Sequence, residues 1–303
     1  MLFAKPRTAR LAAPLLAAAL LTGCAGTPPA PRPEPSSTTT SAVPAADSFH
    51  RLEQRFDARL GVYVLDTGSG REVTYRAGER FAFASTIKAL TAGALLRRVS
   101  DAGLDKVVTY RQRDVLAWAP VASKHVATGM KVRDLLAASL DYSDNTAANL
   151  VTAELGGPEA VQQALRGLGD ATTDVSRTEP ALNETAPGDR RDTSTPRALA
   201  DDLRQYVLGD VLPADRRQLL TGWMLANTTG GPYVRAGVPA GWKVGDRTGN
   251  ADHGTRNDIA VAWPGGGRKP VVIVVLSDRD RRNAPSDDAL IAQATRAALN
   301  ALG

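Results

Sequence analysis

Residues 83–99 read FASTIKALTAGALLRRV, and the fold can be worked out from this stretch outward. The segment 89–99 is apolar at helical spacing and predicts a buried helix that opens with Ser85 and Lys88. Three residues are nearly one helical turn, so these two side chains share a face. Taken alone, Ser85 is as well explained as a helix cap and Lys88 as a solvated charge. Because the surroundings are apolar, Lys88 is expected to be desolvated, which favours its neutral form.

The sequence following this stretch is mostly helical as far as residue 208. Helices are predicted where apolar residues recur three and four positions apart, at 131–140, 146–155 and 158–168. An irregular segment, 172–196, interrupts the pattern with three Pro, a Gly and many charges. Loops of this length in a compact domain are usually functional or disordered.

Strand-like segments lie on both sides of the helical middle. Apolar and β-branched runs predict strands at 61–68, 74–77, 242–246, 258–263 and 270–276, with helices starting near Phe49 and at 286–302. This order predicts an α+β fold, in which an antiparallel sheet is flanked by N- and C-terminal helices and carries an inserted all-helical domain. The expected limits are about 47–80 and 231–303 for the sheet subdomain and about 81–230 for the helical subdomain.

The first residues indicate export. Lys5, Arg7 and Arg10 precede an apolar run at 11–21 that is too short to cross a bilayer, so 1–23 is predicted to be a signal peptide. Leu21-Thr22-Gly23-Cys24 resembles the bacterial lipobox, in which the Cys is lipidated and becomes the mature N-terminus. The alternative is a soluble secreted protein that loses Cys24 with the peptide.

Residues 24–46 are rich in Pro, Ser, Thr and Ala, a composition that predicts a disordered tether between Cys24 and a folded domain at 47–303. The expected location is therefore outside the cytoplasmic membrane. We expect a lipoprotein that is membrane-anchored only through Cys24, faces the cell exterior or the periplasm, and also exists in a released form.

Charge and composition exclude several classes of protein. The net charge is +5, of which Lys5, Arg7 and Arg10 contribute three, so the remainder carries +2 and has no basic block for nucleic acid. The single Cys excludes an intramolecular disulfide. The three His, at positions 50, 125 and 253, form no metal-ligand spacing, so neither a metal nor another cofactor is expected.

Two further motifs accompany Ser85 and Lys88. Ser143-Asp144-Asn145 stands just before a predicted helix and, alone, is explained as a cap. Gly245-Asp246-Arg247-Thr248-Gly249 ends a predicted strand, where a cation beside a hydroxyl can hold a carboxylate. An edge strand with a solvated Arg is the simpler explanation of that segment alone.

Together, in this order, the three motifs resemble the penicillin-recognising serine enzymes, which include β-lactamases and peptidoglycan peptidases. The loop carries Glu179-Pro180-Ala181-Leu182-Asn183, which resembles the Glu-x-x-Leu-Asn of class A β-lactamases. The peptidases lack this water-activating Glu. The chain therefore resembles a class A serine β-lactamase, and its rivals are a peptidase and a non-catalytic envelope-binding lipoprotein of the same fold.

The resemblance implies a role for each matching residue. Ser85 attacks the lactam carbonyl, Lys88 or Glu179 takes its proton, and Ser143 relays a proton to the ring nitrogen. The backbone N–H groups of Ser85 and Asn250 form an oxyanion hole. Substrate-binding residues implied by the resemblance are Trp118, Asn145, Asn183, Arg247, Thr248, Gly249, Asn250 and Arg256. The implied partners are small β-lactams only, and the protein is expected to be a monomer.

Three finer expectations follow from the same resemblance. Glu179–Pro180 should be cis, and Arg177 should pair with Asp192 across the loop. Most class A enzymes have Lys where this chain has Arg247, and the Arg-Thr-Gly form resembles the carbenicillin-hydrolysing subgroup. Hydrolysis of penicillins, carbenicillin included, is therefore expected.

Overall fold

A five-stranded antiparallel sheet is built from both ends of the chain, as predicted. In the computed structural model, which describes residues 42–186 and 188–303, the strand order is β2-β1-β9-β8-β7. The strands are β1 (Arg59–Asp66), β2 (Glu72–Tyr75), β7 (Lys243–Ala251), β8 (Thr255–Trp263) and β9 (Val271–Asp278). β1 joins the two ends of the chain, because it pairs with β2 on one side and with β9 on the other.

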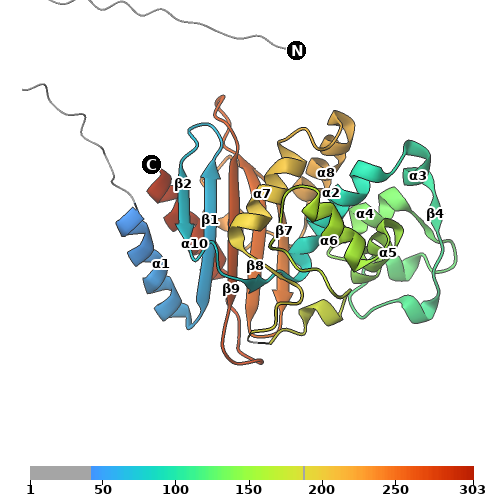
Figure 1. The fold of residues 1–303 in the computed structure, drawn as a ribbon, viewed down its shortest axis with the longest axis horizontal. Helices are drawn as coiled ribbons and strands as arrows, with labels where there is room; N and C mark the ends of the chain where they lie inside the picture. Colours follow the sequence, from blue (N-terminus) through green and yellow to red (C-terminus); the bar gives the residue numbers. More distant parts are fainter. Residues whose placement is uncertain (1–41, 187) are drawn as a thin grey trace, which may run out of the picture. The chain divides into compact units, whose positions relative to one another are not determined.

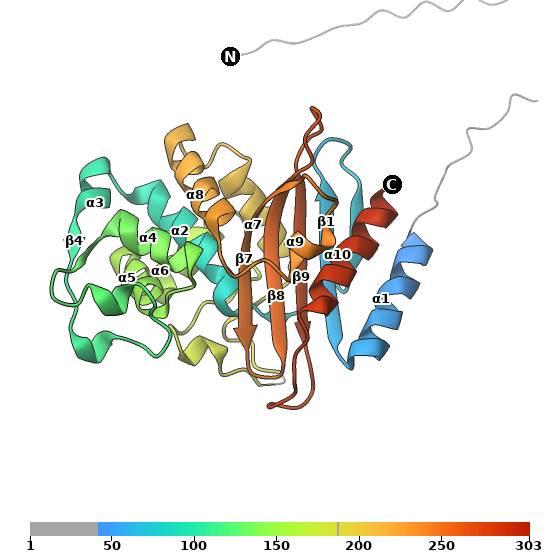
Figure 2. The ribbon, with the colours of Figure 1, turned by 180° about the vertical axis from the view of Figure 1, so that it is seen from behind.

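The two faces of the sheet bury separate cores, because side chains alternate along each strand. In β9, Val272, Val274 and Leu276 belong to one core, whereas Ile273 and Val275 belong to the other. The second core is covered by α1 (Ala42–Phe56) and α10 (Ala289–Leu302), the predicted flanking helices. Figure 2 shows α10 lying across this face.

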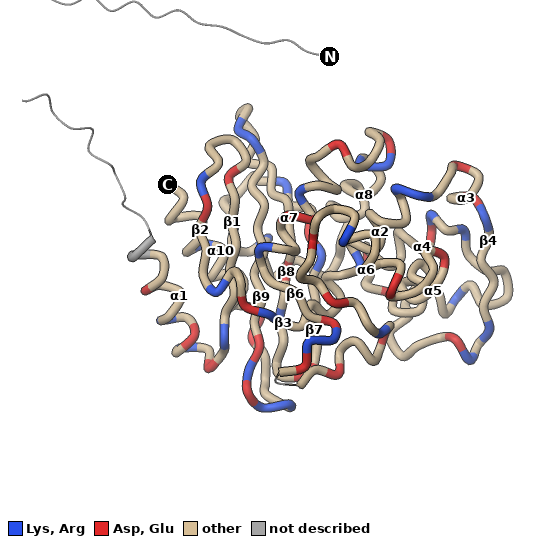
Figure 3. Tube along the Cα trace, viewed as in Figure 1, with Lys and Arg blue, Asp and Glu red and all other residues tan. Residues whose placement is uncertain are grey.

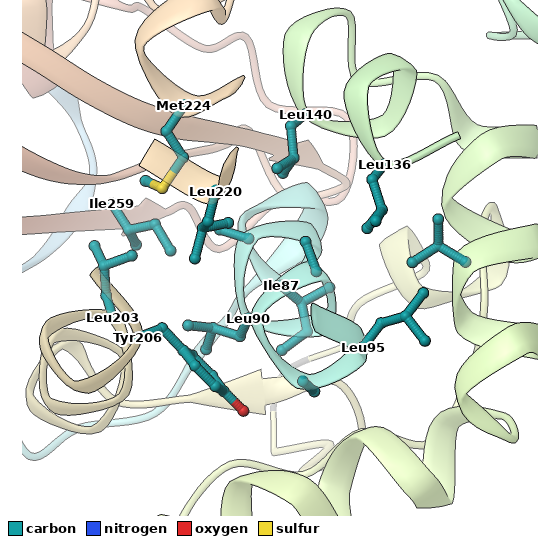
Figure 4. Close-up of a cluster of buried hydrophobic side chains, with 14 of the residues drawn as sticks. Ile87, Leu90, Leu95, Leu136, Leu140, Leu203, Tyr206, Leu220, Met224 and Ile259 are labelled. Atoms are coloured by element: carbon teal, nitrogen blue, oxygen red, sulfur yellow. The ribbon is translucent and has the colours of Figure 1, made fainter. Parts of the chain in front are cut away.

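The opposite face of the sheet is covered by α7 (Pro196–Val207). This face lies on the side of the sheet where the helical part of the chain is found (Figure 1). The central helix there is α2 (Ile87–Arg98), and ten of its twelve residues, beginning at Ile87 and ending at Leu96, are buried. Figure 4 shows Leu90 of α2 among side chains from α7, α8 (Ala214–Ala226) and the sheet, which are Leu203, Tyr206, Leu220, Met224 and Ile259.

The remaining elements surround α2 or link it to the sheet. The helices are α3 (Asp101–Asp105), α4 (Val132–Asp141), α5 (Asn145–Leu155), α6 (Pro158–Arg166) and α9 (Val234–Gly237). Four 3-10 turns are η1 (Ala84–Thr86), η2 (Gln112–Asp114), η3 (Ala122–Lys124) and η4 (Ala181–Asn183). Two short strand pairs are β3 (Phe81–Ala82) with β6 (Thr193–Ser194) and β4 (Val107–Val108) with β5 (Met130–Lys131).

The structure differs from the sequence prediction in three places. α1 begins at Ala42, so residues 42–46 extend a helix where a tether was expected, and Ala45 is already buried. α7 lies within the expected helical subdomain but packs on β8 and β9. β7 continues to Ala251 instead of ending near residue 246, because β8 pairs along it as far as Ala251 and Thr255. The Arg247 motif therefore lies within a strand.

Charged residues are distributed widely over the folded part. Figure 3 shows basic and acidic residues interspersed around the sheet and the helices, in keeping with the absence of a basic block in the sequence. Between residues 42 and 303, leaving aside residue 187, no helix is long and apolar enough to cross a membrane. The predicted signal peptide, Cys24 and most of the predicted tether lie outside the described residues.

Candidate active site

Ser85 and Lys88 lie at the start of the buried central helix. Ser85 belongs to η1 and Lys88 to the first turn of α2, and both side chains are buried. The helix is buried as far as Leu96 because other helices pack around it. Lys88 is thereby removed from water, as its apolar sequence context predicted.

Glu179 is brought to these two residues by the 172–196 loop. The Ser85 hydroxyl donates a hydrogen bond to Glu179 Oε1 over 2.9 Å, and Lys88 Nζ lies 2.9 Å from the same oxygen. Asn183 Nδ2 donates to the other oxygen, Oε2, over 2.5 Å. A hydroxyl, an amine and a carboxylate thus form one hydrogen-bonded group, although Ser85 and Glu179 are 94 residues apart in the sequence.

Burial and mutual charge set the protonation of this group. Burial lowers the pKa of Lys88 to about 8, against the opposing effect of the Glu179 carboxylate. Burial alone would raise the pKa of Glu179, but the charge of Lys88 and hydrogen bonds from Lys88, Ser85 and Asn183 hold it below its ordinary value. Glu179 is therefore an ionised acceptor at neutral pH, and Lys88 is an amine close to its own titration point.

The Ser143 motif faces Lys88 from the start of α5. Lys88 Nζ donates to Asn145 Oδ1 over 2.6 Å and to Ser143 Oγ over 3.2 Å. Asp144, which sequence reasoning treated only as a helix cap, accepts from the backbone N–H of Ala147 at 2.9 Å and of Val121 at 3.0 Å. This fully buried carboxylate therefore fastens the segment after Trp118 to the Ser143 motif as well as capping α5.

β7 closes the other side of the site. Arg247 is fully buried and its Nη2 donates to Ser143 Oγ, so the cation reaches the same hydroxyl as Lys88. Burial lowers the pKa of Arg247 to about 10, which leaves it charged at neutral pH. A side chain at Gly249 would place its Cβ only 2.9 Å from the carbonyl oxygen of Phe83. Glycine at this position therefore permits β7 to approach the turn that carries Ser85.

A cavity of about 260 Å³ opens over Ser85. Trp118 is 58% exposed at its wall, with its indole N–H donating to the carbonyl of Tyr142 over 3.0 Å. The lining residues are Ser85, Trp118, Ser143, Asn145, Asn183, Thr229, Thr248, Gly249 and Asn250. All but Thr229 were singled out in the sequence, and Thr229 was missed although its hydroxyl lies 2.6 Å from that of Thr248.

The other predicted site residues lie outside the cavity lining. Lys88, Glu179 and Arg247 are buried in contact with the residues that line it. Arg256 is on β8 opposite Asn250, and its Nε donates to Asp288 over 2.9 Å. The structure therefore groups two catalytic candidates, Lys88 and Glu179, and the substrate-binding candidate Arg247 with Ser85 and Ser143. Arg256 is held in an ion pair at the side.

The loop that presents Glu179 has the two predicted features. The Glu179–Pro180 bond is cis, and Arg177 Nε donates to the fully buried Asp192 over 2.5 Å. Asn149 of α5, which the sequence did not reveal, fixes the backbone of Glu179 through both of its amide atoms, at 2.8 and 2.9 Å. Only the fold could identify Asn149, because it lies 30 residues from Glu179. No group of three or more His, Cys, Asp or Glu in the described part of the chain could hold a metal ion.

Comparisons with known proteins agree with this geometry. Residues 44–302 match the family described as "Beta-lactamase enzyme family". The chain is 53% identical over 256 residues to "Beta-lactamase" of Bacillus licheniformis, with 84% of this chain and 83% of that protein covered. It is 52% identical over 270 residues to "Beta-lactamase" of Amycolatopsis lactamdurans, with 89% of each covered.

Solved structures give the same result. A class A β-lactamase from Clostridium kluyveri DSM 555 superposes with a TM-score of 0.84 at 44% identity, covering 86% of this chain and 99% of that one. A class A β-lactamase from Mycobacterium abscessus gives a TM-score of 0.82 at 48% identity, covering 86% and 99%. The motifs alone had left a peptidase and a non-catalytic lipoprotein as rival interpretations. Three findings decide between these interpretations: the matched family, the identity along the whole folded domain and the cluster around Ser85. The chain belongs to the β-lactamase family and is a class A β-lactamase, an enzyme that hydrolyses β-lactams.

Proposed function

We propose that this enzyme opens the β-lactam ring through an acyl-enzyme on Ser85. The Ser85 oxygen attacks the lactam carbonyl carbon and the ring C–N bond breaks. The hydroxyl proton passes to Glu179, toward which the hydroxyl already points at 2.9 Å. Ser143, which accepts hydrogen bonds from Lys88 and Arg247, delivers its proton to the departing ring nitrogen. The Lys88 ammonium reprotonates Ser143 and takes up the proton held by Glu179, so Glu179 is ionised again before deacylation. The backbone N–H groups of Ser85 and Asn250 stabilise the developing oxyanion.

Deacylation then hydrolyses the Ser85 ester. Glu179 removes a proton from an attacking water molecule, whose oxygen bonds to the acyl carbon, and the proton returns to the Ser85 oxygen as the ester bond breaks. Asn183 and Asn149 hold the Glu179 carboxylate and backbone in position for this step. A general base used in both half-reactions must remain ionised, and the lowered pKa of Glu179 supports that role.

The observation that carries this proposal is the shared contact of Ser85 and Lys88 with one oxygen of Glu179. It is tested by incubating benzylpenicillin with three variants and measuring protein mass. Glu179→Gln is expected to accumulate a protein–penicilloyl adduct, and Ser85→Ala is expected to form none and to lose about 10⁶-fold in kcat. Glu184→Gln, an exposed neighbour on the same loop, is the matched control and should turn over normally. Turnover of Glu179→Gln at the parent rate would contradict the proposal.

The substrates proposed are penicillins, with carbenicillin among them. Arg247, Thr248 and Arg256 would hold the ring carboxylate, Asn145 and Asn183 would contact the side-chain amide, and Trp118 would form a wall. The support for carbenicillin is Arg247, a cation that burial leaves charged at neutral pH. A buried permanent charge beside the cavity favours substrates that carry a second carboxylate.

We further propose that the enzyme acts as an exported, monomeric lipoprotein. The basic residues and apolar run at the start, followed by Cys24, support export and lipid attachment. In this form the only link to the membrane is the lipid on Cys24, and the enzyme faces the cell exterior or the periplasm.

A further inference from the structure

A second cavity, of about 310 Å³, lies behind the loop that carries Glu179. Its walls come from four parts of the chain: the start of β1, the segment that enters β3, the second half of the 172–196 loop, and the adjoining ends of β8 and β9. None of its lining residues lines the cavity over Ser85. It is therefore a separate site on the same loop.

The walls of this cavity carry an excess of arginine. Arg59 is paired with Asp278 at 2.9 Å, and Arg191 is paired with Asp189 at 2.7 Å. In the described part of the chain, no carboxylate lies in ion-pair contact with the other three arginines that line the cavity, Arg80, Arg190 and Arg279. The remaining acidic residue in the lining, Asp280, is exposed and contacts none of them. These three arginines thus have no ion-pair partner, although carboxylates further away act on two of them: Asp170 and Asp174 on Arg80, and Asp57, Asp278 and Asp287 on Arg279.

Neutral acceptors hold two of these arginines in place. Arg80 donates from Nε to Thr193 Oγ1 over 2.9 Å and from Nη1 to the carbonyl of Thr172 over 2.8 Å. Arg279 is only 8% exposed and donates from Nη1 to the carbonyl of Gly254 over 2.7 Å. These contacts orient the guanidinium groups but do not neutralise them, and a buried charge without a partner is costly.

The effect of this crowding is visible in the acid–base properties of the two groups. Burial lowers the pKa of Arg80, and the nearby charge of Arg190 lowers it further. Burial likewise lowers the pKa of Arg279, with a further contribution from Arg256, which lies outside the cavity lining. An anion bound between Arg80 and Arg190 would offset the repulsion between them.

We propose that this cavity binds a small multivalent oxyanion of the phosphate class. Arginine offers planar, paired donors that match two oxygens of a phosphate group, whereas chloride, a single atom, offers no pair of oxygens for such a bidentate contact. A volume near 310 Å³ is at the lower end for small-molecule sites and suits inorganic phosphate, pyrophosphate or a small phosphate ester.

The bound anion would fasten the loop to the sheet. Arg190 belongs to the loop and stands two residues before Asp192, whereas Arg279 directly follows β9. Next to the cavity, the N–H of Arg279 donates to the carbonyl of His253 over 2.8 Å, and the N–H of Asp252 donates to the carbonyl of Asn183 over 3.2 Å. Asn183 in turn holds Glu179. Anion binding should therefore slow the opening of the segment that positions Glu179.

The test is calorimetric titration of the purified full-length protein with inorganic phosphate and with pyrophosphate, at constant ionic strength maintained with sodium chloride. We expect saturable binding, tighter for pyrophosphate, and an unfolding midpoint that rises with anion concentration. Amide hydrogen exchange at residues 188–194 should slow on binding. Equal affinities for phosphate and pyrophosphate would limit the ligand to a single phosphate group, and absence of saturable binding by both would overturn the proposal.

Matched charge variants locate the site. Arg190 is exposed, so Arg190→Gln should fold, and it is expected to weaken binding about ten-fold, equivalent to about 1.4 kcal/mol. Arg268→Gln removes an equal charge from an exposed residue in the loop at the opposite end of β9, and should bind as the parent does. Arg279→Gln should abolish binding if it folds. Equal affinities in Arg190→Gln and Arg268→Gln would place any binding elsewhere and overturn the proposal.

Discussion

Arg247 shows why a lysine and an arginine are not equivalent at the same buried position. Both Lys88 and Arg247 are buried and both contact Ser143. Burial brings the pKa of Lys88 to about 8 but leaves that of Arg247 at about 10. A guanidinium begins from a much higher ordinary pKa than an amine, so it keeps its charge where an amine would begin to lose it.

This difference leads to a prediction for Arg247→Lys. The ratio of kcat/KM for carbenicillin to that for benzylpenicillin should fall in the variant, because the second carboxylate loses a permanent cation and up to two charge-assisted hydrogen bonds of about 1.5–3 kcal/mol each. The fall should grow as the pH rises from 7 to 9, since the introduced amine would deprotonate in this range. Steady-state kinetics with both penicillins at several pH values measure it. A ratio that stays unchanged, or a parent that hydrolyses carbenicillin far more slowly than benzylpenicillin, would contradict the carbenicillin proposal.

The sequence revealed the residues of the site but not how they are connected. Ser85, Lys88, Ser143 and Glu179 could be predicted because each belongs to a motif with its own local pattern. Asn149 and Thr229 could not, since a half-buried Asn or Thr looks ordinary until the fold places it beside Glu179 or Thr248. Asp144 could be predicted only as the cap of the following helix. The contact between Arg247 and Ser143, 104 residues apart, likewise depends on the packing of β7 against the turn of Ser85.

Among the elements, the 172–196 loop is held in its conformation by a buried ion pair between Arg177 and Asp192. Asp192 accepts from the backbone N–H of Ser176 and of Arg177, at 2.9 and 3.0 Å, and from the Arg177 side chain. Its own carbonyl accepts from the N–H of Phe83 over 3.1 Å, which ties the neck of the loop to the segment before Ser85. The sequence predicted this pair from resemblance, and its physical basis is that a fully buried carboxylate gathers three donors.

Arg177→Ala should therefore loosen the loop. The variant leaves Asp192 buried without its cation. The free energy of unfolding should fall by about 3 kcal/mol, the low end for a broken buried ion pair, because two backbone donors to Asp192 remain. Acylation and deacylation should both slow, since Glu179, the base proposed for both steps, is on the loop. Limited proteolysis within 172–196 should accelerate. Arg191→Ala is the control: it removes an exposed pair with Asp189 from the same loop. If both variants are cleaved at the same rate, the Arg177–Asp192 pair does not hold the loop.

Helix α7 carries a carboxyl that is buried beside another. Burial raises the pKa of Asp202 to about 9, and the neighbouring Asp170 adds to the effect. The folded protein thus keeps a proton on Asp202 between about pH 4 and 9, whereas the unfolded chain releases it. This group contributes most stability below its ordinary pKa of 3.8, and that contribution is lost as the pH rises through 9.

Asp202→Asn should remove this pH dependence. Relative to the parent, the variant should gain stability by up to about 1.4 kcal/mol per pH unit between pH 5 and 8, because one proton is taken up on folding in the parent and none in the variant. Urea unfolding of both proteins at several pH values gives the comparison. Parallel curves of unfolding free energy against pH would show that Asp202 is ionised in the folded protein.

At the scale of the whole molecule, the arrangement of the sheet followed from the order of predicted elements. Strands at both ends of the chain required a single sheet with an insertion, and the pairing of β1 with β9 provides it. The position of α7 could not be predicted, because helical periodicity identifies an apolar face but not whether that face packs on a helix or on the sheet. The end of β7 was misplaced for a related reason: Arg247 and Thr248 are polar, and only pairing with β8 shows that the strand continues through them.

The last prediction concerns where the molecule is held. If Cys24 carries a lipid, the anchor and the active site are separate parts of the chain, since Cys24 precedes α1, the first helix of the described residues, which begins at Ala42. Cys24→Ser should then move the enzyme from the detergent phase to the aqueous phase on partitioning of cells, while kcat/KM for a penicillin stays the same. Ser36→Ala, a small change within the expected tether, serves as the control and should partition as the parent does. The unchanged kinetics matter as much as the partitioning, because a misfolded variant would also leave the membrane fraction but would lose activity. Equal partitioning of Cys24→Ser and the parent would exclude lipid on Cys24 as the anchor.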